Sequence, residues 1–89
     1  MEIIQRASAG TLESSDAYVE IEPGTDGISL QLESVVMEQF GDTIKETVHQ
    51  LLSELSVENA NIRVIDRGAL ECVIRARVET AVLRGKGNA

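Results

Sequence analysis

The sequence predicts an α+β protein in the order β-β-β-α-β-α, with a mainly antiparallel sheet and two helices packed on one face of it. Two observations favour this class. Apolar and polar residues alternate between residues 17 and 33, as in strands with one buried face. The apolar period then changes to three or four residues, which is typical of an amphipathic helix. With 89 residues, the chain is expected to form one domain over 1–84, followed by a disordered tail over 85–89.

The first expected strand lies within residues 1–12, with a bulge at Gly10. A polar corner over residues 10–16 follows, and it contains the adjacent serines Ser14 and Ser15. Serine hydroxyls in turns usually bond to nearby backbone groups. From the residues alone, this corner is an exposed, serine-containing turn at the tip of a hairpin.

The next two expected strands are 17–22 and 28–33, separated by a loop at 23–27 that holds the only proline and two glycines. Because short connections usually join neighbouring strands, these segments predict a β-meander over about residues 3–33.

A long helix is expected next, with Ser34 as its N-cap and a single apolar stripe. Gly41 lies inside it and costs about 1 kcal/mol relative to alanine, so the helix either packs closely there or bends. The stripe consists of Met37, Phe40, Ile44, Val48, Leu51, Leu52 and Leu55.

Residues 62–65 read as a short strand that could join the meander as its fourth member, and 66–68 as a turn. From Ala69 onward, helical spacing of apolar residues predicts a second helix. The alternative is a strand at Leu70–Val78 followed by a short helix, because that stretch contains β-branched residues.

Composition excludes several classes of partner. Fifteen acidic and eight basic residues give a net charge of -7, which repels nucleic acid and anionic membrane surfaces. That charge favours either solubility or a basic protein partner. A single cysteine and no visible signal peptide favour a cytoplasmic location, and no apolar run is long enough to span a membrane.

No catalytic apparatus or metal site is indicated. His49 is expected to be a solvated or boundary residue of the first helix, and Cys72 to lie on or beside the buried stripe of the second. The carboxylates, Asp66 among them, are interpreted as solvated charges without a ligand register. Two classes remain: a carrier, or a non-covalent acidic adaptor that binds through a sheet edge or the helix face around Asp42 and Glu46.

Three separated motifs, in register over nearly the whole chain, resemble the acyl carrier protein (gamma subunit) of citrate lyase. They are the runs Ala9–Asp16, Gln39–Asp42 and Asp66–Glu79. Related carrier subunits belong to malonate decarboxylase, but the Gly-Thr-Leu-Glu-Ser and Gln-Phe-Gly-Asp runs favour the citrate branch.

The resemblance implies a phosphoprotein in which Ser14 carries 2'-(5''-phosphoribosyl)-3'-dephospho-coenzyme A through a phosphodiester. This prosthetic group would carry acetyl and citryl thioesters during cleavage of citrate to acetate and oxaloacetate. The implied partners are the alpha and beta subunits of citrate lyase, a prosthetic-group transferase and an acetylating ligase; the carrier itself is non-catalytic. The family often has glycine where this chain has Ser15, so a second hydroxyl lies beside the first.

Overall fold

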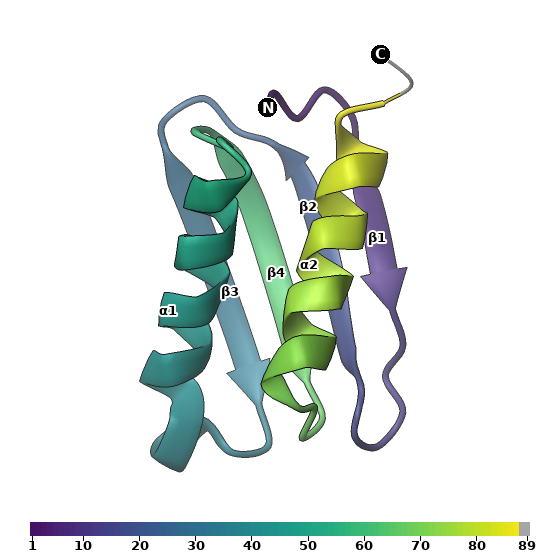
Figure 1. Ribbon diagram of the computed structural model, residues 1–89, viewed down its shortest axis with the longest axis vertical. Coiled ribbons are helices and arrows are strands. Elements are labelled where there is room, and N and C mark those ends of the chain that lie inside the picture. Colours follow the sequence, from purple (N-terminus) through teal and green to yellow (C-terminus); the bar gives the residue numbers. More distant parts are fainter. Residues whose placement is uncertain (88–89) are drawn as a thin grey trace.

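Four strands and two helices follow one another in the predicted order in a computed structural model, which describes residues 1–87. Both helices cover the same face of one sheet (Figure 1), so the predicted α+β class is confirmed. The alternative strand at Leu70–Val78 is wrong, because most of that stretch is helical. The elements are β1 (Ala7–Gly10), β2 (Ala17–Pro23), β3 (Ile28–Ser34), α1 (Met37–Glu54), β4 (Ala60–Asp66) and α2 (Glu71–Gly85).

The predicted meander is wrong in its strand order, which is β1-β2-β4-β3. Strand β4 lies between β2 and β3, antiparallel to β2 and parallel to β3. The parallel pair is possible because α1 connects β3 to β4, and a parallel pair needs a long crossover connection of this kind. The last strand in the chain, β4, is therefore an inner strand of the sheet.

The loop between β2 and β3 bridges the start of β4 instead of closing a hairpin. Pro23 at the end of β2 and Ile28 at the start of β3 flank Ala60 from its two sides. The Ala60 amide donates to the carbonyl of Gly27 at 3.1 Å, and the Gly27 amide donates to Oδ1 of Asn59 at 2.8 Å. These bonds hold the loop over the first residue of β4, which explains how so short a segment joins strands that are not neighbours.

The hydrophobic core lies between the sheet and the two helices. Alternate residues of β2 and β4 are almost fully buried, as the period-2 pattern predicts, and helix α2 adds four buried apolar residues at helical spacing. Aliphatic residues and alanine fill this core, with no aromatic residue among them: Ile3, Ala9, Ala17, Val19, Ile21, Ile44, Val48, Leu51, Leu52, Val57, Ala60, Ile62, Val64, Ile74, Val78, Ala81 and Val82.

Helix α1 begins later than expected. Its N-cap position is Val36, without a side-chain capping bond, so Ser34 is not the N-cap. Ser34 ends β3, and its hydroxyl accepts from the Val36 amide at 3.1 Å and donates to Asp66 at 2.8 Å. At Gly41 an added Cβ would lie 2.9 Å from Sδ of Met37, so the close contact there is with a flexible side chain of the same helix.

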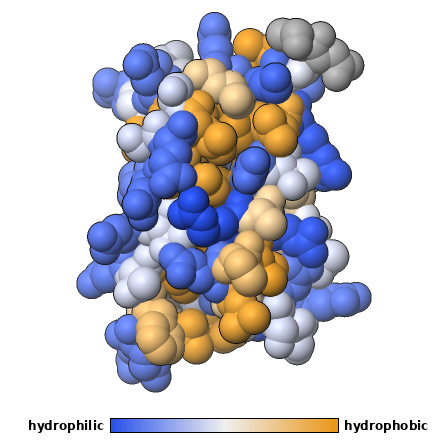
Figure 2. Space-filling model, viewed as in Figure 1, coloured by the Kyte–Doolittle hydropathy of each residue, from blue (hydrophilic) through white to orange (hydrophobic). Residues whose placement is uncertain are grey.

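The apolar stripe of α1 is covered over only part of its length. Ile44 and the later stripe residues pack into the core, whereas Met37 and Phe40 are 38% and 55% exposed. Figure 2 shows apolar surface at the lower end of the view, where the helices begin in Figure 1. The sheet supports α1 only beyond its first turn, so helical period alone overestimates the buried stripe.

Helix α2 continues to Gly85, one residue past the expected domain end, and Lys86 caps it. The last two residues of the expected tail, Asn88 and Ala89, lie outside the described residues. Within residues 1–87, no helix combines the length and the apolar character needed to cross a membrane.

Gly10→Ala is expected to destabilise the protein far more than Gly27→Ala. Both glycines have positive φ, +92° and +79°, which costs an L-residue about 1–2 kcal/mol. At Gly10, however, an added Cβ would lie 1.9 Å from the backbone oxygen of Ala17, whereas at Gly27 it meets nothing within 4 Å. Urea denaturation of the two variants measures the difference, and equal midpoints would contradict this account.

Candidate functional site

The serine corner is the connection of a β-hairpin, as the sequence predicts. Strands β1 and β2 pair antiparallel from Ala7↔Ile21 to Gly10↔Tyr18, and residues 11–16 join them. In Figure 1 this connection lies at the same end of the molecule as the beginnings of both helices. The two serines are therefore presented at one end of a rigid scaffold.

Ser14 and Ser15 are the two central residues of a β-turn. The Asp16 amide donates to the carbonyl of Glu13 at 3.2 Å, which closes the turn. Ser15 has φ +65°, whereas Ser14 is not among the residues with positive φ. This combination is typical of a type II turn, in which the third position prefers glycine. The backbone conformation at position 15 is therefore one that suits glycine.

Both serine side chains are exposed. Within the described part of the chain, the Ser14 hydroxyl makes no hydrogen bond, so the prediction that turn serines bond to nearby backbone is not met by this residue. The hydroxyl that supports the turn is instead that of Thr11, which accepts from the Glu13 amide at 3.2 Å. The Ser14 hydroxyl is therefore available for chemistry without disturbing the loop.

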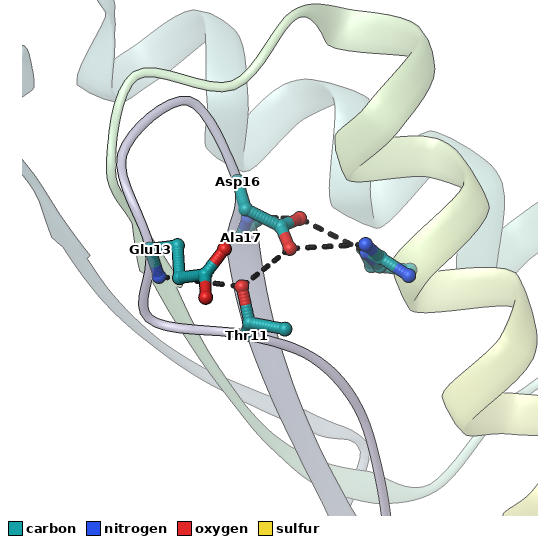
Figure 3. Close-up of polar contacts among 5 residues, drawn as sticks. Thr11, Glu13, Asp16 and Ala17 are labelled. Atoms are coloured by element: carbon teal, nitrogen blue, oxygen red, sulfur yellow. Dashed lines mark hydrogen bonds and ion pairs between the residues drawn. The ribbon is translucent and has the colours of Figure 1, made fainter.

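The Asp16 carboxylate fastens this turn to the body of the protein. It accepts from the Thr11 hydroxyl at 2.6 Å and from the Ala17 amide at 2.7 Å (Figure 3). Arg77 of α2 donates Nε to Oδ1 at 3.0 Å and Nη2 to Oδ2 at 2.9 Å. Bidentate contacts between arginine and a carboxylate are among the strongest polar contacts in proteins. One carboxylate therefore ties together the loop, the start of β2 and the second helix.

Two backbone bonds tie the turn to the end of β4 as well. The Ser15 amide donates to the carbonyl of Arg67, and the Arg67 amide donates to the carbonyl of Asp16, each at 2.9 Å. Both Ser15 and Asp16 thus lie opposite Arg67, as in a β-bulge, directly past the last ladder pair, Ala17↔Asp66. Sequence reasoning missed these links and the Asp16–Arg77 pair, because partners about 50 or 60 residues apart leave no local pattern.

Arg77→Gln is expected to raise the pKa of Asp16. Hydrogen bonds from Arg77, and then from Thr11 and the Ala17 amide, hold the pKa of this carboxyl well below its ordinary range. Because the folded pKa is lowered, the pair stabilises the fold above the unfolded pKa of about 4, and this is lost as pH falls through the folded pKa. A carboxyl ¹³C titration by NMR should show Asp16 still ionised where exposed carboxyls titrate.

The matched control for this titration is Arg75→Gln, which removes an arginine of the same helix that pairs with Glu54 at 2.9 Å. It should leave the Asp16 titration unchanged. If Asp16 titrated identically in the wild-type protein and in Arg77→Gln, the arginine would not be the cause of the lowered pKa.

Other predicted residues lie elsewhere. His49 is exposed on α1, as expected, but Cys72 is exposed rather than on the buried stripe of α2, because the buried residues of that helix begin at Ile74. Asp66, interpreted as a solvated charge, is only 1% exposed. It accepts from Ser34 Oγ at 2.8 Å and from the amides of Gly68 and Ala69, so its role is structural.

Among residues 1–87, no group of three or more histidine, cysteine or acidic side chains could hold a metal ion.

Comparison with family models matches residues 4–85 to the ACP family, described as "Malonate decarboxylase delta subunit (MdcD)". A solved structure shows the same fold: a chain in a Pseudomonas malonate decarboxylase hetero-tetramer in complex with malonate superimposes with a TM-score of 0.81 and 26% identity. The match covers 94% of this chain and 87% of that one. The family model and the shared fold place the chain among small acyl carrier subunits.

Several of the curated proteins most similar to this chain are acyl carrier proteins of citrate lyase. The citrate lyase acyl carrier protein of Escherichia fergusonii is 54% identical over 85 residues, and that of Lactococcus lactis subsp. lactis is 52% identical over 84. Each match covers 94% of this chain and 88% of the relative. The chain belongs to the citrate lyase acyl carrier protein family.

Proposed function

We propose that this protein is the acyl carrier subunit of a citrate lyase and that Ser14 is the residue that bears its prosthetic group. The observation that carries the proposal is the exposed Ser14 hydroxyl, which makes no hydrogen bond within residues 1–87 and lies in a turn fixed on both sides. A modifying enzyme can reach such a hydroxyl, and the anchored turn then holds whatever is attached. The family membership supports the same reading.

The proposed group is 2'-(5''-phosphoribosyl)-3'-dephospho-coenzyme A, joined to Ser14 Oγ by a phosphodiester. The residues present fit an anionic group of this kind. Ser14 is exposed, and the neighbouring residue Arg67, whose backbone bonds to Ser15, is exposed as well. The Asp16 carboxylate, which would repel an anion, is already neutralised by Arg77.

When bound, the group supplies the thiol on which acetyl and citryl units are carried as thioesters during cleavage of citrate to acetate and oxaloacetate. This chain's residues do the positioning. The Asp16–Arg77 pair fixes the turn to α2, and the bonds to Arg67 fix it to β4. Because the acyl group is tethered to the protein, it meets the active sites of partner subunits at a high effective concentration.

The proposed partners are the alpha and beta subunits of citrate lyase, a transferase that loads Ser14 and a ligase that acetylates the thiol. We also propose that the carrier itself is non-catalytic and that it works in the cytoplasm. The hetero-tetrameric assembly of the Pseudomonas malonate decarboxylase supports a multi-subunit setting for this class of carrier. Electrostatic attraction of a chain with net charge -7 to basic partner surfaces would speed such encounters.

Intact mass tests the proposal. Co-expression with the loading enzymes should add one prosthetic group to each chain, seen as a single large mass increment. An unmodified protein under conditions that load a relative from the same family would overturn it.

Two alternatives give different results. A carrier subunit of malonate decarboxylase, favoured by the description of the family model and by the structural relative, would restore activity to that complex rather than to citrate lyase. A non-covalent adaptor would bind its partners equally well after Ser14→Ala. The 52–54% identity to citrate lyase carriers favours the citrate reading over both.

A further inference from the structure

We propose that the guanidinium of Arg67 binds the phosphate attached at Ser14 and so holds the base of the prosthetic group against the turn. The inference rests on the proposed function, because it needs an anionic group on Ser14. It assigns to Arg67 a positioning role at the attachment site, distinct from that of Arg77.

The position of Arg67 follows from the backbone. Its amide and carbonyl pair with Asp16 and Ser15, at 2.9 Å each, so it lies directly across from the turn that holds Ser14. Ser14 is the chain neighbour of Ser15, about 3.8 Å away from Cα to Cα, so it is within reach of a long side chain at this position. Arg67 is thus the arginine whose backbone is bonded to the serine turn itself.

The side chain of Arg67 lies outside the core, unlike that of its neighbour Asp66. Asp66 ends β4, and its buried carboxylate bonds to Ser34 and to the start of the segment leading into α2. Arg67 comes next in the chain, past the end of β4 and opposite the serine turn. Its side chain is exposed there and does not contribute to the core.

Within residues 1–87, Arg67 is also the arginine whose guanidinium has no acceptor. Within residues 1–87, the guanidinium groups of the other five are engaged: Arg6 and Arg63 with Glu20, Arg75 with Glu54, Arg77 with Asp16, and Arg84 with the carbonyl of Ser8. In a chain with net charge -7, this leaves Arg67 as an exposed cation that can bind an anionic partner. A phosphate on Ser14 would supply the missing acceptor, because guanidinium binds phosphate through two parallel bonds.

Charge balance at the turn favours the same arrangement. Glu13 and Glu33 are exposed carboxylates on either side, since Glu33 pairs with Ile65 two residues before Arg67, and no ion pair involves them within residues 1–87. Asp16 takes up the charge of Arg77. A phosphodiester on Ser14 would add a further negative charge next to Glu13, and Arg67 is a cation that can offset this charge.

The test uses the loaded protein and ³¹P NMR of its phosphodiester. In Arg67→Gln, the resonance should shift and narrow relative to the wild-type protein, because the phosphate loses its anchor and moves more freely. Arg67→Lys, which keeps the charge but not the two parallel bonds, should lie between the two. The matched control is Arg63→Gln, which removes an exposed arginine of β4 four residues before Arg67 and should leave the resonance unchanged.

A second NMR measurement follows the side chain of Arg67 directly. On loading, the Nε–Hε signal of Arg67 should shift more than that of any other arginine. If the mass increment and phosphodiester resonance are present but Arg67→Gln behaves like Arg63→Gln, the inference is wrong and the proposed function stands. If the wild-type protein shows neither increment nor resonance, the proposed function itself fails.

Discussion

Ser14→Ala is expected to abolish the mass increment that the proposed prosthetic group adds on co-expression with the loading enzymes, while the protein stays folded. The loss should be complete, since the alanine offers no oxygen for the phosphodiester. Stability should change by less than about 0.5 kcal/mol, because the side chain is exposed and its hydroxyl makes no hydrogen bond within the described residues. Intact mass and urea denaturation of the same preparation measure the two effects.

The neighbouring serine provides the controls. Ser15→Ala should load like the wild-type protein. Ser15→Gly should also load, with stability equal to or up to about 1 kcal/mol above wild type, because glycine suits the φ of +65° at that position. If Ser14→Ala were still loaded and Ser15→Ala were not, the attachment residue would be Ser15.

Asp66→Ala is expected to lower the free energy of unfolding by about 2–4 kcal/mol, since it leaves two amides and a hydroxyl without their acceptor in a part-buried setting. That is a large fraction of the roughly 5–13 kcal/mol typical of a domain of this size. Ser34→Ala removes one of the three donors and should cost about 1 kcal/mol. Urea denaturation with a two-state fit gives each value.

The control for Asp66 is Asp26→Ala, an exposed aspartate in the β2–β3 loop for which no side-chain bond occurs within residues 1–87. It should change stability by less than about 0.5 kcal/mol. Equal urea midpoints for the two alanine variants would show that Asp66 is not the structural anchor described above.

The period of apolar residues predicted the element types well but not their buried lengths. The alternation in residues 17–22 and 28–33 and the helical spacing after Ser34 each correspond to an observed element. Met37 and Phe40 continue the helical period yet remain largely exposed, because no other element among residues 1–87 covers these side chains at the start of α1. The spacing of apolar residues shows which face of a helix or strand is apolar. How much of that face is buried depends on how far the neighbouring elements extend along it.

Strand order could not be predicted by the same reasoning. A short loop between two antiparallel segments usually makes a hairpin, and the loop at 24–27 has the composition of one. Its actual course depends on Ala60, which arrives 33 residues after Gly27 and bonds to it. Contacts between residues so far apart leave no mark on either local pattern.

For the candidate site, local sequence was enough to predict the serine turn and its place between two strands. Three separated motifs gave the family resemblance, which implies Ser14 as the attachment residue. Only the fold shows the contacts that hold the turn, because they join Asp16 to Arg77, 61 residues away, and to the backbone of Arg67. It also separated the two serines, since backbone conformation, not composition, gives Ser15 a position suited to glycine. The physical reason is the same in each case: local residue patterns fix local geometry, but packing brings distant charges and strand ends to one point.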